Sequence, residues 1–261
     1  MTRIELDIKK SLEENASAYF EKAKKAKKKI AGAKKALERA REKLKCLEEK
    51  KDVEIKAAKA KKEKTKRKAQ WYEKFRWFRT SEGFLVIGGR DATTNEIVVK
   101  KHTSADDIVF HTDMAGSPFL ILKCENKEPS EQSLKEVADA TCSFSRAWKL
   151  GLGSQKIFYV NPDQVTKEAK AGEFLTKGSF MIKGKTNYID NKINAAVGIA
   201  DDGAVMAGPV EAIKKHCRQY VELEQGSEKT STIAKKILKK IGGDLDEIIR
   251  AMPSGGCRIK Q

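Results

Sequence analysis

The sequence predicts an α+β protein in which a long antiparallel coiled-coil hairpin precedes a mixed, mainly antiparallel sheet domain with packed helices. Apolar residues in the N-terminal third repeat with helical heptad spacing, which indicates a coiled coil. Farther along, strand-like runs are followed by a helical run and then by more strand-like runs, an order typical of α+β folds. We therefore expect three parts: a basic coiled-coil arm (1–79), a globular domain (80–225) and a short helical C-terminal appendage (226–261).

The arm carries a continuous stripe of small and apolar residues separated by alternating steps of four and three. Its members are Leu12, Ala16, Tyr19, Ala23, Ala26, Ile30, Ala33, Leu37, Ala40, Leu44 and Leu47. A lone helix cannot bury such a stripe, so a partner helix is expected. We expect residues 52–78 to fold back as that partner, with residues 48–52 at the tip of the hairpin. A parallel homodimer is the alternative.

The positive charge is concentrated in the arm. The whole chain has a formal net charge of +17, and residues 1–79 contain 28 Lys and Arg against 13 Asp and Glu, a net charge of +15. A polyanion is the natural partner of such a segment, although Lys-rich helices can also be merely solvated. The basic face of the coiled coil is expected to include Lys24, Lys25, Lys28, Lys62, Lys66 and Arg67.

The elements expected in the globular domain follow from the period of the apolar residues. Four strands, at 84–87, 97–99, 108–111 and 118–124, are predicted to form a meander, and a helix is predicted at 130–150. Further strands are predicted at 156–160, 194–200 and 220–223, with a short helix at 210–215. In the appendage, two helices are predicted to begin near Thr230 and Asp244, and a Lys-rich face on the first could either face solvent or contact RNA.

A phosphate site is predicted at the turn that follows the first of these strands. Gly88 and Gly89 give the backbone freedom for a close approach, and Arg90 follows at once. A local ion pair between Arg90 and Asp91 is the alternative interpretation. The side chains expected to bind RNA are Arg76, Arg79, Arg90, Lys100, Lys101, His111, Arg146, Lys149 and Lys177, and we expect Arg76, Arg79, Arg90, Lys100 and Lys101 to cluster on one face.

Several other classes of protein are disfavoured. The five cysteines are scattered without a CxxC pair, which indicates reduced thiols of a cytoplasmic protein, and the three histidines lack metal-ligand spacing. We therefore expect no metal and no cofactor, and no apolar run is long enough to cross a membrane. A hydrolytic cluster could be drawn from Asp106, Asp107, His111 and Asp113. Because no nucleophile elbow, Walker loop or metal spacing accompanies it, we expect no enzyme and expect His111 to form a hydrogen bond in the core.

Several motifs, in their order along the chain, resemble the RNA-binding domain of the NFACT family of ribosome-associated quality-control factors, the group of NEMF and RqcH. They are WYEKFRWF, GFLVIGGRDATTNEIVVKK, the His111/Asp113 pair, PDQV and GEFLTKGSFMIKG. Asn15-Ala16 with Tyr19-Phe20 resembles the start of the family's coiled coil, and the tail is consistent with an archaeal member. Lys170-Ala171-Gly172 departs from the pattern, since members usually have Ser before the Gly-Glu pair.

The resemblance implies binding to a stalled large ribosomal subunit that still carries peptidyl-tRNA. It also implies recruitment of alanyl-type tRNA for template-free extension of the nascent chain, with the coiled coil reaching toward the stalk base of the subunit. The family's N-terminal domain and helix-hairpin-helix module have no counterpart, so the chain is interpreted as a central and C-terminal fragment. The alternative function is a scaffold in which the coiled coil docks a partner protein and the globular domain is structural.

Overall fold

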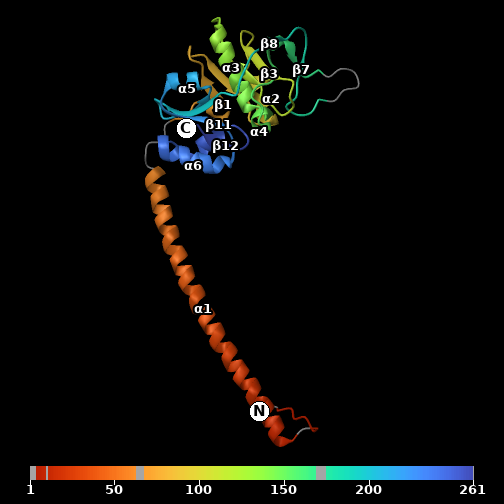
Figure 1. Ribbon diagram of the computed structural model, residues 1–261, viewed down its shortest axis with the longest axis vertical. Coiled ribbons are helices and arrows are strands. Elements are labelled where there is room, and N and C mark those ends of the chain that lie inside the picture. Colours follow the sequence, from red (N-terminus) through yellow and green to blue (C-terminus); the bar gives the residue numbers. More distant parts are fainter. Residues whose placement is uncertain (1–3, 10, 63–67, 169–174, 261) are drawn as a thin grey trace. The chain divides into compact units, whose positions relative to one another are not determined.

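The computed structural model describes residues 4–9, 11–62, 68–168 and 175–260, with the backbone alone described for 45–62 (Figure 1). The chain divides into two compact units, residues 1–66 and 67–261. Each unit has its own architecture, and the two are described in turn.

The first unit consists of one long helix and a short segment folded against its start. Helix α1 spans Leu12–Lys62. Its N-terminus is closed by a capping box in which Ser11 Oγ accepts from Glu14 N and Glu14 Oε2 accepts from Ser11 N. Asn15 exchanges two hydrogen bonds with the backbone of Asp7, and Tyr19 Oη donates to the carbonyl of Glu5. These bonds hold residues 4–9 along the first turns of α1.

The predicted hairpin is wrong, because α1 runs without a break through residues 48–52, the expected tip. The tip sequence contains Glu and Lys but no Gly or Pro, so nothing in it ends a helix. Residues 71–78, expected in the returning helix, form a 3-10 turn, η1 (Trp71–Lys74), and most of strand β1 (Arg76–Arg79). The apolar side chains of β1 are buried and the strand pairs with β2, a packing that overrides helical propensity.

The second unit contains a six-stranded sheet in the order β1-β2-β4-β3-β5-β8, in which every neighbouring pair is antiparallel. Its strands are β1, β2 (Leu85–Gly88), β3 (Ile108–Thr112), β4 (Leu120–Leu122), β5 (Ile157–Val160) and β8 (Asn187–Ile189). All residues of β2 and β4 are buried. This sheet contains three of the four strands expected in a meander, but the meander itself is wrong, because β4 lies between β2 and β3.

The fourth expected strand is a helix. Residues 97–99 belong to α2 (Ala92–Lys101), because Asp91 caps the N-terminus of this helix by accepting a hydrogen bond from Thr94 N. The single helix predicted at 130–150 is divided into α3 (Glu131–Phe144) and α4 (Arg146–Leu150) at Ser145. Ser145 Oγ donates to the carbonyl of Cys142 and accepts from Ala147 N, so this side chain ends one helix and begins the next. Helix α3 packs on strands β3, β4 and β5 (Figure 1).

A second sheet has the order β10-β9-β11-β12. Its strands are β9 (Ala195–Ala200), β10 (Val205–Gly208), β11 (Cys217–Glu228) and β12 (Cys257–Ile259), and its helices are α5 (Val210–His216), α6 (Thr230–Ile241) and α7 (Leu245–Ala251). A two-stranded ribbon, β6 (Val165–Thr166) with β7 (Met181–Ile182), follows the short turn η2 (Pro162–Gln164). The predicted strands at 156–160, 194–200 and 220–223 and the predicted helices at 210–215 and after Thr230 and Asp244 are confirmed, whereas β12 was not anticipated.

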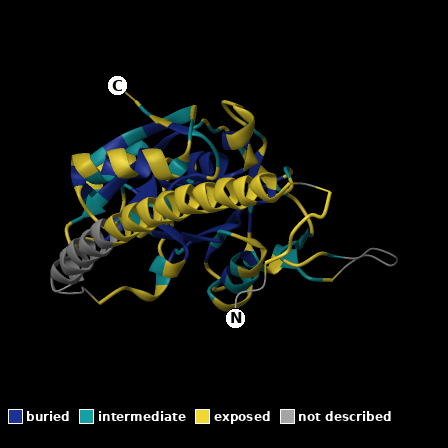
Figure 2. Ribbon diagram, turned by 90° about the horizontal axis from the view of Figure 1, so that it is seen from below, coloured by how far each residue is buried: buried dark blue, intermediate teal, exposed yellow. Residues whose placement is uncertain are grey.

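One hydrophobic core joins the two sheets. The two sheets meet where β1 lies against β10, and a Cβ atom on Gly208 would approach Phe78 Cγ to 2.7 Å, so only glycine allows this spacing. Ile233 and Ile237 of α6 and Ile248 of α7 are buried in the same core. Helix α1 differs: from Leu12 to Leu44 every residue except Asn15 is exposed (Figure 2). Its heptad stripe is therefore uncovered within the described part of the chain.

Candidate nucleic-acid interface

A groove of about 720 Å³ lies where several loops of the second unit converge. It is bordered by the turn before α2, the β3–β4 loop, the start of α4 and the turn before β7. We call it the basic groove, defined by the six basic or histidine side chains that line it: Arg76, Arg90, His111, Arg146, Lys149 and Lys177. All six were expected from the sequence to bind RNA. Two carboxylates, Asp91 and Asp113, also line it.

Glycines allow the loops to come together. Gly178 has a φ of +81°, and a Cβ atom there would lie 2.6 Å from Ala92 Cα, so the turn carrying Lys177 can approach the start of α2 only with glycine at this position. This approach brings the ammonium group of Lys177 near Asp91, where it contributes to lowering the pKa of that carboxyl, after the larger effect of the hydrogen bond from Thr94 N. The basic residues of the groove thus come from segments far apart in sequence.

Aromatic rings form one wall of the groove. The imidazole of His111 stacks on Phe119, with ring centroids 3.7 Å apart and an angle of 6° between the planes. Phe180 meets Phe119 edge-on, and Phe158 meets His111 edge-on. His111 Nδ1 lies 3.0 Å from the carbonyl oxygen of Pro118, and burial lowers the pKa of His111. His111 is therefore neutral at pH 7 and offers a flat ring more than a charge.

Arg76 and Arg90 lie deeper than the lysines. Arg76 is buried, donates from Nη1 to the carbonyl of Met252, and places its guanidinium carbon 4.6 Å from the ring centroid of Phe144. Burial, with the nearby charge of Arg90, lowers the pKa of Arg76 to about 10. Arg90 Nη2 donates to the carbonyls of Phe75 and Glu73, at 2.7 and 3.3 Å. By contrast, Arg146, Lys149 and Lys177 are exposed and free to reach a ligand.

The expected clustering of Arg76, Arg79, Arg90, Lys100 and Lys101 is not observed, because only Arg76 and Arg90 line the groove. Arg76 and Arg79 are three residues apart in β1 and so point to opposite faces of the sheet. Arg79 instead donates to the carbonyl of Gly83. Lys100 pairs with Glu96 one helical turn earlier, at 2.6 Å, and Lys101 is exposed at the end of α2.

The alternative interpretation of the GGRD turn is not observed either. No ion pair joins Arg90 to Asp91 among the described residues, because the carboxylate of Asp91 caps α2 and the guanidinium of Arg90 turns to backbone carbonyls. Sequence reasoning missed Ser117, which lines the groove and whose Oγ is buried without a hydrogen-bond partner. It lies in a small-residue turn, DMAGS, whose composition indicates a turn but not an unpartnered polar atom.

The basic residues predicted on the arm are only partly described. Lys24, Lys25 and Lys28 are exposed on α1, and Lys24 Nζ lies 3.9 Å from Glu21 Oε1. Lys62 is the last residue of α1, and its side chain lies outside the described residues, as do Lys66 and Arg67.

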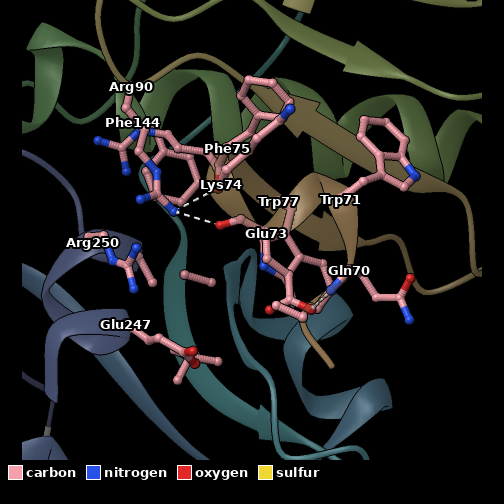
Figure 3. A pocket seen from close by; sticks show the side chains of 15 residues that line it. Gln70, Trp71, Glu73, Lys74, Phe75, Trp77, Arg90, Phe144, Glu247 and Arg250 are labelled. Atoms are coloured by element: carbon pink, nitrogen blue, oxygen red, sulfur yellow. Dashed lines mark hydrogen bonds between the residues drawn. The ribbon is translucent and has the colours of Figure 1, made fainter. Parts of the chain in front are cut away.

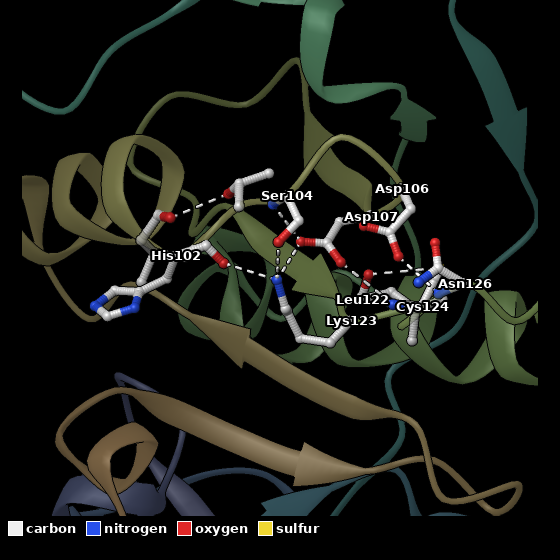
Figure 4. A network of polar contacts seen from close by, with 10 residues as sticks. His102, Ser104, Asp106, Asp107, Leu122, Lys123, Cys124 and Asn126 are labelled. Carbon is white, nitrogen blue, oxygen red and sulfur yellow. Dashed lines mark hydrogen bonds and ion pairs between the residues drawn. The ribbon is translucent and has the colours of Figure 1, made fainter.

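The residues considered for hydrolysis have separate roles. Asp107 is buried and pairs with Lys123, and Asp106 accepts a hydrogen bond from Asn126 N (Figure 4). His111 instead forms the predicted hydrogen bond, to Pro118. In the part of the chain that the structure describes, no group of His, Cys, Asp and Glu side chains is suited to hold a metal ion. Among the same residues, no helix is long and apolar enough to span a membrane.

Two family models match the chain. The model of the NFACT protein RNA binding domain matches residues 74–184, which include most of the basic groove, and the model of the NFACT N-terminal and middle domains matches residues 1–69. Among solved structures, that of the C-terminal part of the fibronectin/fibrinogen-binding protein of Streptococcus suis is 15% identical to this chain. The match covers 49% of each chain, with a TM-score of 0.39.

Curated relatives come from all three domains of life. The archaeal Rqc2 homolog aRqcH of Methanocaldococcus jannaschii is 40% identical over 76% of this chain and 30% of its own length. The human ribosome quality control complex subunit NEMF is 37% identical over 67% of this chain and 16% of its own. The Rqc2 homolog RqcH of Bacillus subtilis is 27% identical over 55% of this chain and 28% of its own length. The chain thus spans less than a third of the length of these relatives.

Proposed function

The chain belongs to the NFACT family, and we propose that it is the RNA-binding part of a ribosome quality-control factor, with the basic groove as its RNA site. The observation that carries this proposal is the convergence of Arg146, Lys149 and Lys177, all exposed, beside the stacked rings of His111 and Phe119. Cationic side chains hold phosphates, and His111, which is half-buried on the buried ring of Phe119, is the ring that could meet an unpaired base.

The finer function follows from the family. We propose that the whole protein recognises stalled large ribosomal subunits with peptidyl-tRNA, contacts tRNA and rRNA, and supports template-free C-terminal tailing. The lysines of α1 would reach toward the stalk base, and the protein would act in the cytoplasm. We propose no chemical step for this chain, since peptide-bond formation belongs to the ribosome.

The test is binding to isolated large subunits and to tRNA over a salt series. The groove variant changes Arg146, Lys149 and Lys177 together to Gln, and the control changes Lys214, Lys215 and Lys235, which are exposed and do not line the groove. Each lost phosphate contact should reduce the slope of log Kobs against log salt by about 0.7 to 0.9, so the groove variant should lose about 2 units. The control should keep the parent slope. An equal loss in both variants would make the groove one part of a diffuse positive surface.

A protein-docking scaffold is the second candidate. The uncovered stripe on α1 favours it, since Ile30, Leu37 and Leu44 are each more than half exposed. If α1 docks a protein of the large subunit, changing Ile30 and Leu37 to Ser should abolish binding to that subunit, while the groove variant leaves it intact. Binding would then show little dependence on salt.

A further inference from the structure

A second pocket, of about 350 Å³, lies between η1, β1 and α7 and gathers three guanidinium groups. We call it the arginine pocket and define it by Arg76, Arg90 and Arg250. Figure 3 shows Arg90 and Arg250 on one side of the pocket and Trp71 and Gln70 on the other. Arg76 and Arg90 also line the basic groove, so these two side chains lie between the arginine pocket and the groove.

The three arginines have neutral partners only. Arg76 donates to the carbonyl of Met252 and to Ser254 Oγ, Arg90 donates to two carbonyls, and Arg250 donates to the carbonyl of Asp246. Within the described part of the chain, no carboxylate forms an ion pair with any of them. The Nε atom of Arg90 is moreover buried without a hydrogen-bond acceptor. Arg76 is buried, Arg90 is half-buried and Arg250 is exposed, so the two deeper guanidinium groups lack the paired carboxylate that a buried charge ordinarily has.

The charges also repel one another. The pKa of Arg90 is lowered by burial first and by the charge of Arg250 second, against a smaller opposing effect of Asp91, and that of Arg76 is lowered by burial and by the charge of Arg90. The remaining charged residues of the pocket are Lys74, Glu73 and Glu247. Glu73 Oε1 accepts from Gln70 N. Against these two carboxylates stand Arg76, Arg90, Arg250 and Lys74, so the pocket keeps an excess of positive charge.

We propose that the arginine pocket binds a phosphate group. A guanidinium presents paired N–H donors that match two phosphate oxygens, and three guanidinium groups line this pocket. The phosphate could belong to RNA or to free phosphate, and the chemistry of recognition is the same. The inference does not depend on RNA binding in the basic groove, since Arg250 and Trp71 line only the arginine pocket.

Tryptophan fluorescence can report binding here, because Trp71 and Trp77 line the pocket. We would titrate the full chain with inorganic phosphate at constant ionic strength, with chloride as the reference. The variant is Arg250→Gln, and the matched control is Arg218→Gln, which removes an exposed arginine from β11. We expect a saturable change with phosphate, a Kd raised at least tenfold by Arg250→Gln, and a Kd left unchanged by Arg218→Gln.

A second set of measurements identifies the source of the phosphate. A short RNA with a 5′-phosphate that binds tighter than the same RNA with a 5′-hydroxyl, a preference lost in Arg250→Gln, would place an RNA terminus in the pocket. Equal binding of both RNAs, displaced by inorganic phosphate, would place an internal phosphodiester there. Phosphate binding without any RNA binding would leave free phosphate as the ligand and would refute only the groove proposal.

Two results would overturn the inference: no saturable response to phosphate, or the same Kd in the parent and in Arg250→Gln. Arg250→Lys guards against a folding defect, because it keeps the charge but loses the paired donors. An intermediate Kd is expected for it. Thermal unfolding of each variant without phosphate establishes that the fold is retained.

Discussion

Asp107 is the buried carboxylate on which the turn between α2 and β3 depends. It accepts hydrogen bonds from Ser104 N at 2.7 Å and from Cys124 N at 3.3 Å, and it pairs with Lys123 (Figure 4). Lys123 Nζ also donates to the carbonyl of His102 and to Ser104 Oγ. The group thus joins the end of α2, the start of β3 and the end of β4.

Replacing Asp107 with Asn should destabilise the globular unit by about 3 kcal/mol, because the half-buried Lys123 would lose its counter-charge. Urea unfolding measures the loss. Asp106→Asn is the matched control, since Asp106 is exposed and accepts a hydrogen bond from Asn126 N. A similar loss in both variants would show that the pairing with Lys123 contributes no specific stability.

Individual residues show how far the candidate site could be predicted. Arg146, Lys149 and Lys177 were expected to bind RNA but not to lie near the GGRD turn, and they line one groove with Arg90 of that turn. Arg79 was wrongly grouped with Arg76, because a helical period was assumed where the chain forms a strand, in which residues three positions apart point to opposite faces. Arg250 could not be found from the sequence, since its proximity to Arg90 depends on α7 packing near β1.

At the scale of an element, α2 shows why a short apolar run is ambiguous. Ile97, Val98 and Val99 fit a strand as well as a helix, and the cap upstream decides the outcome. Only Val98 of the three is fully buried, as expected for one face of a helix. The tail shows the same limit. The sequence of Cys257–Ile259 indicates a loop, and the segment is a strand because it pairs with the edge of β11.

The cap of α2 can be tested by two substitutions at Asp91. Asp91→Ala should cost about 1 kcal/mol at pH 7, because the N–H of Thr94 loses its acceptor, whereas Asp91→Asn should cost little, since Asn also caps helices. The hydrogen bond from Thr94 holds the pKa of Asp91 below its usual 3.8. The carboxylate's contribution is therefore complete above about pH 4 and is lost as pH falls through the lowered value.

Urea unfolding of parent and Asp91→Asn between pH 2 and 7 would follow this effect. The stability of the parent should fall relative to that of Asp91→Asn in acid. A constant difference across that range would mean that the carboxylate does not act as the cap.

Helix α1 is the element on which the sequence-based prediction and the structure differ most. At about 1.5 Å per residue, residues 38 and 62 lie about 36 Å apart along a single helix. In a hairpin with its tip near residue 50 they would face one another at about 10 Å. Spin labels can be attached at Glu38→Cys and Lys62→Cys in a Cys46→Ser background. The distance between them, measured by electron paramagnetic resonance, distinguishes the single helix from the hairpin. A distance near 10 Å would restore the hairpin and supply the partner that the heptad stripe needs.

The whole molecule divides its charge unevenly: residues 1–66 hold 23 Lys and Arg against 12 Asp and Glu, a net charge of +11, and the larger unit, residues 67–261, carries the remaining +6. Such a division predicts two distinct contributions to binding. Long-range attraction should depend on the arm and on salt, whereas orientation should depend on the groove. The two contributions should be additive, because the variants change separate sets of side chains.

Neutralising the six lysines between residues 22 and 29 with Gln tests this division. If all six contact phosphates of the large ribosomal subunit, the slope of log Kobs against log salt should fall by about 4 to 5 units, and by less in proportion if fewer do. The groove variant should add its own loss of about 2 units on top, because it removes up to three further contacts. As a control, Glu13 and Glu21 are changed to Gln, which alters α1 without removing positive charge. The opposite outcome is a lysine variant with the parent slope and a groove variant with a smaller one. The lysines of the arm would then be solvated and contact no phosphate, and α1 would act instead through its uncovered apolar stripe.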